Sequence, residues 1–158
     1  LFNQAKITAD FRKTTVAAKE KQQQTGQISS AMELEDGTII TAHTSPLLGC
    51  SAALLLNVTK HLAGIDHATK LIPQSMIEPI QYTKIQYLGG QNPRLHTDEV
   101  LVALSVLSKD DDNCRRALEQ LPKLRGCQVH CTVMLGEVDR KIFKKLGVNL
   151  SCEPILKK

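Results

Sequence analysis

Two short segments of the sequence contain side chains that can bind anions, and each segment leads directly into a predicted helix. The first, Thr44 to Ser51, is a hydroxyl- and glycine-bearing turn between a predicted strand and a predicted helix. The second, Asn92 to Thr97, places an amide, a guanidinium and an imidazole directly before another predicted helix. Backbone N–H groups at a helix N-terminus lack a partner within the helix and, together with the helix dipole, attract anions. Both segments are therefore candidates for one ligand site.

We predict that a phosphate-like or carboxylate group binds between these two segments. Arg94 would supply a bidentate guanidinium, and His96 would orient the ligand or transfer a proton near neutral pH. The predicted ligand-binding residues are Thr44, Ser45, Gly49, Ser51, Asn92, Arg94 and His96. The structural alternative is that the same residues form turns and caps, with Arg94 holding its loop in an ion pair. The catalytic residues stay unassigned.

The five cysteines and five histidines are the possible transition-metal ligands, and their spacing does not favour a metal site. Cys127 and Cys131 are four residues apart and Cys152 lies on the predicted neighbouring strand, which makes a zinc site conceivable. Because that spacing covers roughly 13 Å along a strand, buried free cysteine is the favoured interpretation. Residues Asp110 to Asp112 stand at a helix junction, where an N-cap is more common than a metal site. No metal is predicted, and the cofactor is left unknown.

Elements of both regular types must position these residues. Helices are predicted over residues 11–24, 50–62, 77–88, 97–107, 113–121 and 137–146, and strands over 28–34, 38–43, 127–135 and 148–153. Asp36-Gly37 between the first two strands is a strong hairpin signal. Thr97 is expected to cap its helix, and Pro79 is expected near the first turn of its own. The last strand–helix–strand unit predicts a parallel pair joined by a right-handed crossover.

These elements predict a three-layer α/β/α fold whose mixed sheet has about four strands. Residues 1–26 are expected to form an N-terminal helical appendage, and residues 27–158 the α/β domain. The hairpin, the loop and the apolar helix resemble the opening of the cytidine-deaminase-like fold. Zinc deaminases carry H-x-E at that helix start and P-C-x-x-C at a later turn. The segment 48–52 holds neither His nor Glu, so the architecture is expected without the zinc chemistry.

Composition excludes several classes of protein. The chain has 158 residues, of which 42% are hydrophobic and 23% charged, with a net charge of +4. Aromatic residues make up only 3%, and no basic stripe accompanies them, which argues against nucleic acid as a partner. No apolar run is long enough to span a membrane. An odd number of cysteines without a secretory signal favours a cytoplasmic location, and the first residue, Leu1, suggests a fragment of a longer chain.

Several motifs occur in an order that resembles one known family. Asp36 to Thr41 reads Asp-Gly-Thr-Ile-Ile-Thr, Asn92 to His96 reads Asn-Pro-Arg-Leu-His, and Leu146 to Leu150 reads Leu-Gly-Val-Asn-Leu. Together with Thr44-Ser45 they resemble the C-terminal part of uncharacterised protein family 0371, bacterial proteins of about 500 residues. The resemblance implies a cytoplasmic protein whose C-terminal region has a cytidine-deaminase-like architecture and no known reaction. It also implies that one partner is the rest of the chain's own longer protein.

Two functions remain open on this basis. The first is a ligand-binding or active-site-completing domain, in which the two helix-start segments face a shared cleft. The alternative is a non-catalytic oligomerisation or scaffold module, in which apolar helices pack on a partner such as a second copy. The first requires the Ser45 and Arg94 loops to lie at the same end of the sheet, and the second requires a large exposed apolar patch elsewhere.

Overall fold

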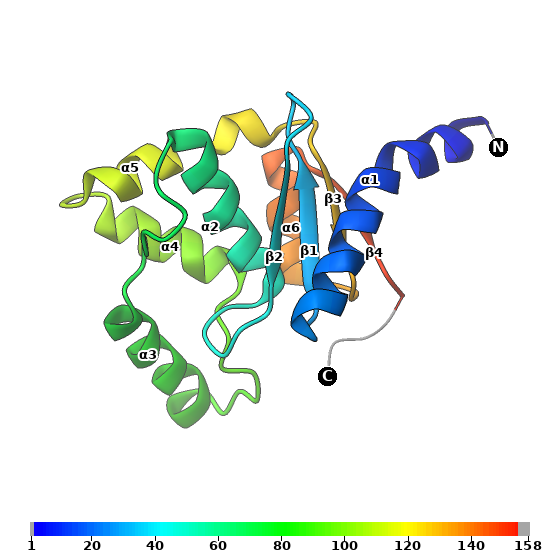
Figure 1. Cartoon of the computed structure of the whole chain (residues 1–158). Helices are drawn as coiled ribbons and strands as arrows, with labels where there is room; N and C mark the ends of the chain where they lie inside the picture. Colours follow the sequence, from blue (N-terminus) through cyan, green and yellow to red (C-terminus); the bar gives the residue numbers. More distant parts are fainter. Residues whose placement is uncertain (1, 155–158) are drawn as a thin grey trace.

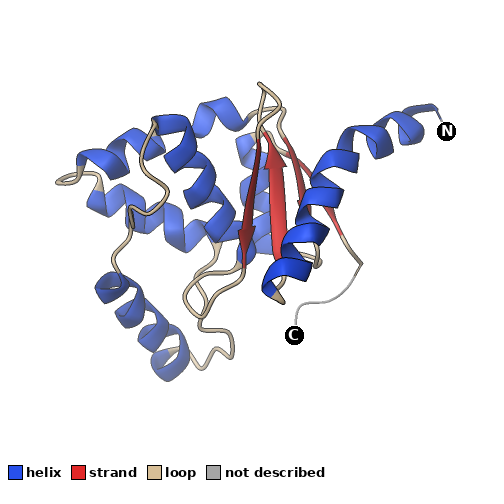
Figure 2. Ribbon diagram, viewed as in Figure 1, coloured by secondary structure: helices blue, strands red, loops and turns tan. Residues whose placement is uncertain are grey.

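The computed structural model describes residues 2–154, and the side chains of residues 13–154, as an α/β structure with one mixed sheet. Its strands are β1 (Ser29–Glu33), β2 (Ile39–His43), β3 (Gln128–Cys131) and β4 (Asn149–Cys152), in the order β2-β1-β3-β4. β1 is antiparallel to β2 and β3, and β3 is parallel to β4. The predicted sheet, an antiparallel hairpin joined to a parallel pair, is confirmed (Figure 1 and Figure 2).

Helices cover both faces of this sheet. The described residues form α1 (Phe2–Thr25), α2 (Cys50–Ala63), α3 (Gln74–Tyr82), α4 (Thr97–Leu107), α5 (Asp112–Leu118) and α6 (Glu137–Leu146). A π-helical turn, η1 (Thr83–Tyr87), follows α3, and a 3₁₀ turn, η2 (Leu121–Leu124), follows α5. α1 packs on one face of the sheet, α2 and α6 pack on the other, and α4 and α5 lie outside them (Figure 1).

The hairpin forms where the sequence predicts it. Gly37 takes a φ of +89°, a left-handed conformation that glycine adopts without strain. The Asp36 carboxylate accepts the backbone N–H of Thr38 at 2.9 Å and so fixes the turn. Glu33 then faces Ile39 at the first pair of the ladder. This pairing sends β2 back along β1 and delivers the chain to the turn before α2.

Two apolar clusters hold the layers together, and α2 contributes to both. Between the sheet and the helices α2 and α6, the fully buried side chains include Met32, Leu54 and Phe143. On the other side of α2, a second cluster joins it to α4 and α5, with Leu104 and Ala117 fully or almost fully buried. An apolar surface too wide for an exposed helix predicts this central place for residues 50–62, and the structure confirms it.

Three expected boundaries are corrected by the structure. α3 begins at Gln74, directly after Pro73, so Pro79 is the sixth residue of the helix rather than part of its first turn. The α-helical pattern continues past Pro79, ends at Tyr82 and gives way to η1. The helix predicted over residues 113–121 is α5 followed by η2, and its cap is Asp111, which accepts two backbone N–H groups. The strand predicted over 127–135 ends at Cys131, and the following residues turn toward α6.

The sequence predicts Thr97 as the N-cap of α4, but in the structure the N-cap is His96. The backbone N–H of His96 donates to the Glu99 carboxylate at 2.8 Å, which closes the start of the helix. The hydroxyl of Thr97 is engaged elsewhere, at 2.6 Å from a carboxylate oxygen of Asp139. A tertiary partner therefore decides which residue occupies the cap.

None of the helices among the described residues combines the length and apolar character needed to cross a membrane.

Candidate functional site

The two segments singled out in the sequence lie side by side in the structure. The backbone N–H of Leu95 donates to the Leu47 carbonyl at 3.0 Å, and the N–H of Gly49 donates to the Leu95 carbonyl at 3.2 Å. The Arg94 guanidinium also reaches across, donating from Nε to the Ser45 carbonyl at 2.8 Å. The starts of α2 and α4 therefore meet at one end of the sheet. This is the arrangement that a shared site requires.

Three of the six predicted side chains in these segments, Ser45, Asn92 and Arg94, hold the two loops by hydrogen bonds. The Ser45 hydroxyl accepts the N–H groups of Leu47 and Leu48, both at 3.2 Å. The Asn92 amide oxygen accepts the Arg94 N–H at 3.0 Å. Thr44 is buried, and its hydroxyl oxygen has no hydrogen-bond partner within the described part of the chain. The structure thus gives Ser45, Asn92 and Arg94 internal partners, and their contact with a ligand stays a prediction.

The other two predicted side chains, Ser51 and His96, converge on a residue that sequence reasoning missed. The Ser51 hydroxyl donates to one carboxylate oxygen of Asp139 at 2.9 Å. The other oxygen accepts the Thr97 N–H at 3.0 Å and the Thr97 hydroxyl at 2.6 Å. The His96 Nδ1 atom lies 3.6 Å from Asp139 Oδ2. The Asp139 carboxylate therefore ties together the first turns of α2, α4 and α6.

This carboxylate is ionised although it is buried. Asp139 is only 2% exposed. Burial by itself would raise the pKa of the Asp139 carboxyl, but the neighbouring His96 imidazole and the hydrogen bonds from Thr97 and Ser51 outweigh it and hold the pKa well below its usual range. The negative charge also faces the positive end of the α4 dipole. An internal anion thus occupies part of the place where the sequence predicts an external one.

A depression opens beside this centre. Its volume is about 520 Å³, and its lining residues are His96 and the segment from Met134 to Arg140. The side chain of His96 is about one-third exposed, whereas that of Asp139 is buried behind it. α6 begins here with Gly136 as its N-cap and no side chain that caps its free N–H groups. The depression therefore combines an imidazole, a guanidinium and an open helix N-terminus.

The sequence carries only a weak signal for Asp139. It is the third residue of α6, where an acidic side chain ordinarily complements the helix dipole from a solvated position. Glu137, two residues earlier, is exposed in that way and pairs with Lys141 at 3.0 Å. Nothing in the spacing distinguishes the buried acid from the exposed one. Asp139 differs from Glu137 only because its carboxylate contacts the first turns of α2 and α4 in the folded protein.

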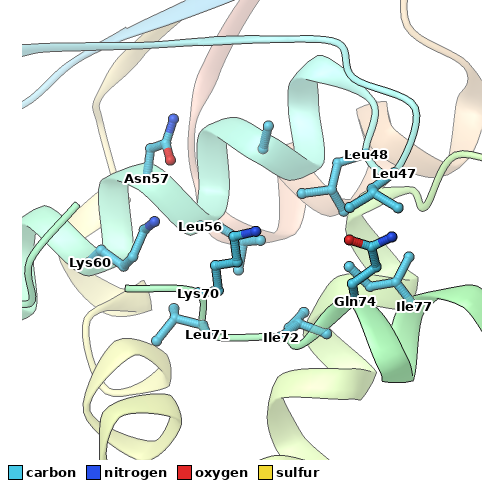
Figure 3. A pocket seen from close by; sticks show the side chains of 11 residues that line it. Leu47, Leu48, Leu56, Asn57, Lys60, Lys70, Leu71, Ile72, Gln74 and Ile77 are labelled. Atoms are coloured by element: carbon cyan, nitrogen blue, oxygen red, sulfur yellow. The ribbon is translucent and has the colours of Figure 1, made fainter. Parts of the chain in front are cut away.

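A second cavity lies on the other side of the Leu47–Leu48 turn, between α2 and the chain leading into α3. Figure 3 shows Leu56, Ile72 and Ile77 around this space of about 170 Å³. Its buried cation, Lys60, donates to the carbonyls of His67 and Thr69 at 2.9 and 3.1 Å. Burial lowers the pKa of the Lys60 ammonium. The lysine is therefore engaged in closing the loop after α2, and the cavity is otherwise mostly apolar.

Cysteine and histidine side chains do not form a metal site in the part of the chain that is described. No group of three or more His, Cys, Asp or Glu side chains there is arranged to hold an ion. The five cysteines are free thiols, four of them buried. The chemistry of the candidate site therefore rests on the pair formed by His96 and Asp139.

Comparison with known proteins identifies relatives over nearly the whole chain. Residues 10–158 match the family described as "Domain of unknown function DUF1846, C-terminal". A UPF0371 protein of Corynebacterium aurimucosum is 54% identical over 151 residues, which cover 96% of this chain and 30% of that protein. A UPF0371 protein of Streptococcus pyogenes serotype M5 is 42% identical over 155 residues, or 98% of this chain and 31% of that protein. The chain thus spans about 30% of the length of these relatives.

Proposed function

The chain belongs to the family of DUF1846 C-terminal domains, and we propose that it is the ligand-binding or active-site-completing part of a longer protein. In this proposal an anionic, phosphate-like group binds in the depression beside His96. His96 contacts the ligand and exchanges a proton with it. Of the other predicted residues, Thr44, Ser45, Gly49, Asn92 and Arg94 belong to the two loops beside His96, and Ser51 binds the Asp139 carboxylate from the first turn of α2.

The observation that carries this proposal is the pairing of His96 with the buried carboxylate of Asp139. A carboxylate next to one ring nitrogen fixes the orientation of an imidazole. With Nδ1 on the side of Asp139, Nε2 is left for a ligand. The separation of 3.6 Å is longer than a hydrogen bond, and such contacts tighten when a ligand is bound. This geometry suits a general acid or base.

The anionic class of the ligand follows from the rest of the lining. The uncapped first turn of α6 presents backbone N–H groups, which favour negative charge. Arg140 adds a guanidinium, the side chain best matched to phosphate or carboxylate oxygens. Glu137, the one other acid in this lining, pairs with Lys141 along the helix. The charge in the depression beyond Asp139 therefore favours an anion.

Phosphate binding to the full-length protein tests the proposal. Titration with inorganic phosphate, followed by calorimetry and by NMR of histidine side chains, is expected to show saturable binding that shifts the His96 resonances. His96→Gln should weaken binding at least about tenfold, the loss of roughly one charged hydrogen bond. His67→Gln, in an exposed position distant in sequence, is the matched control and should bind as the wild type does. Equal affinity in both variants, or no saturable binding, would contradict the proposal.

A second candidate function, the oligomerisation or scaffold module, is favoured by a different surface. Val102 and Val106, one turn apart on α4, are 64% and 63% exposed. They line a shallow groove of about 370 Å³ together with Met76, Ile80 and Ala103. Exposed apolar side chains grouped in this way are typical of a packing surface.

The partner proposed for this groove is the rest of the longer protein, since the relatives are about three times as long as the matched region. Val102→Asp in the full-length protein should then expose cleavage sites to limited proteolysis without changing the mass measured by light scattering. A fall in mass would instead assign the groove to a second copy. Val138→Asp, at an exposed valine on α6, is the control. No change in either measurement would exclude this function.

We also propose that the fold is cytidine-deaminase-like without the zinc chemistry. The hairpin β1–β2, the helix that starts soon after β2 and the parallel unit β3–α6–β4 support this likeness. Where zinc deaminases carry a ligand and a proton-transferring acid, α2 begins with Cys50 and Ser51. Elemental analysis of the purified full-length protein should therefore find no stoichiometric zinc held by this domain. Zinc that is lost on replacing Cys131 or Cys152 would overturn this.

A further inference from the structure

Three cysteines from three different elements meet behind the depression. Cys131 and Cys152 are register partners on the neighbouring parallel strands β3 and β4. Register partners place their side chains on the same face of a sheet, here the face covered by α2 and α6. Cys50, the first residue of α2, lies against Cys131, and the Cys131 thiol is hydrogen-bonded with both of the others. The arrangement is a contact between thiols rather than a set of isolated buried cysteines.

The three thiols differ in their access to solvent. Cys131 is fully buried and Cys50 is 2% exposed. Cys152, near the end of the edge strand β4, is only partly buried. The backbone N–H of Leu135 and the guanidinium of Arg140 both act on its sulfur. Leu135 and Arg140 also line the depression, so Cys152 lies next to the candidate site.

We propose that Cys152 and Cys131 form a peroxide-reactive dithiol in which Cys152 is the attacking thiol and Cys131 the resolving one. Neighbouring strands are about 4.8 Å apart, and disulfides join Cα atoms separated by about 4.4 to 6.8 Å. The register of β3 and β4 therefore allows the bond without moving either strand. The oxidant is hydrogen peroxide or another hydroperoxide, which the surroundings and not the protein must supply.

The chemistry takes place in two balanced steps. The Cys152 thiolate attacks one oxygen of hydrogen peroxide, the O–O bond breaks, and the released hydroxide takes up a proton to become water, leaving a sulfenic acid. The Cys131 sulfur then attacks the Cys152 sulfur, the S–O bond breaks, and the departing oxygen leaves as water with the Cys131 proton. The net reaction converts two thiols and one peroxide into one disulfide and two waters.

The protonation states suit these roles. The hydrogen bond donated by Cys131, followed by the Leu135 N–H and Arg140, outweighs burial and lowers the pKa of the Cys152 thiol to about 7. Cys152 is then about half ionised at neutral pH, and the thiolate is the reactive form. The same hydrogen bond raises the pKa of Cys131 well above its usual value. By contrast, burial raises the pKa of the Cys114 thiol to about 11.

The first experiment maps the disulfide in the full-length protein. After brief exposure to dilute hydrogen peroxide and alkylation of the remaining thiols, tryptic mass spectrometry should find the segment 146–157 linked to the segment 126–140. Because the second segment contains Cys127 as well as Cys131, Cys127→Ser identifies the linked sulfur and should retain the bond. Cys131→Ser and Cys152→Ser should lose it, and Cys114→Ser should keep it. Dithiothreitol should reverse the linkage.

Two further measurements identify the attacking sulfur. In Cys131→Ser, dimedone, a reagent for sulfenic acids, should label Cys152 and no other cysteine. In the wild type, which avoids any folding defect of the variants, iodoacetamide at pH 7 should alkylate Cys152 at least about tenfold faster than Cys114. A disulfide that involves Cys50 or Cys127, linkage only in denaturant, or equal alkylation rates would overturn the proposal.

Discussion

The first turns of α4 and α6 both border the His96 depression, but only the α4 end is closed by a side chain. At α4, the Asp139 carboxylate binds the Thr97 N–H and hydroxyl, and Glu99 accepts the N–H of His96. At α6, Gly136 leaves the first N–H groups without a side-chain cap. A helix start is therefore an anion site only where the protein has not already placed its own anion there. The start of α4 is therefore closed by the protein's own carboxylate, whereas the start of α6 is available to a ligand.

Removing the internal anion should have the largest effect. Asp139→Ala leaves the Ser51 hydroxyl, the Thr97 hydroxyl and the Thr97 N–H without their partner. Because three buried groups lose their partner at about 1 kcal/mol or more each, the free energy of unfolding should fall by at least about 3 kcal/mol. Urea denaturation of the full-length protein measures the free energy of unfolding, and hydrogen exchange locates the loss of stability at the starts of α2, α4 and α6. Glu137→Ala, an exposed acid on the same helix, should cost less than about 1 kcal/mol. Equal effects would show that Asp139 is an ordinary first-turn acid.

The sequence predicts the hairpin and the buried helix that frame the two helix starts, but it does not predict the buried carboxylate of Asp139, and the reason is physical. Asp36-Gly37 specifies its hairpin locally, and the apolar residues 50–62 specify a buried helix by their own periodicity. The environment of Asp139 depends instead on Ser51 and Thr97, which are 88 and 42 residues away along the chain. The same long-range contact explains why Thr97 does not cap α4. Local patterns therefore predict which helix starts exist, and only packing determines which one is filled.

Ser51→Ala removes one partner of the buried carboxylate and leaves the others. A hydrogen bond to a charged group contributes about 1.5 to 3 kcal/mol, so we expect the free energy of unfolding to fall by about 2 kcal/mol. The variant separates the contribution of α2 from that of α4, whose Thr97 still binds Asp139. Ser105→Ala, at an exposed serine whose hydroxyl donates to a carbonyl within α4, should change stability by less than about 0.5 kcal/mol. A loss no greater than that of the control would separate α2 from the carboxylate centre.

Because Asp139 is ionised in the folded protein, its contribution to the free energy of unfolding depends on pH. Its pKa is lowered in the folded protein, so its contribution to stability is complete above the unfolded value of 3.8 and is lost as the pH falls further. From this residue alone, we expect a loss of about 1 kcal/mol between pH 5 and pH 3. Asp139→Asn should lack this component, and its urea midpoint should fall less steeply over that range. Parallel pH profiles for the two proteins would mean that the carboxylate is not held ionised by its partners.

The smallest effect is expected at Arg94, where the two interpretations of the loop differ most clearly. The guanidinium Nε donates to the Ser45 carbonyl at 2.8 Å, which fixes the Arg94 loop to the turn before α2. If this is its main role, Arg94→Ala should lower the free energy of unfolding by about 0.5 to 1.5 kcal/mol and leave the affinity for inorganic phosphate nearly unchanged. An arginine that binds the anion directly should instead cost about 1.5 to 3 kcal/mol in binding free energy, with little change in unfolding. Arg115→Ala, which removes exposed pairs on α5, is the control for loss of one positive charge. Calorimetry and denaturation of the same three proteins distinguish the two roles, and a loss of phosphate binding would extend the site from the open end of α6 to the loop that precedes α4.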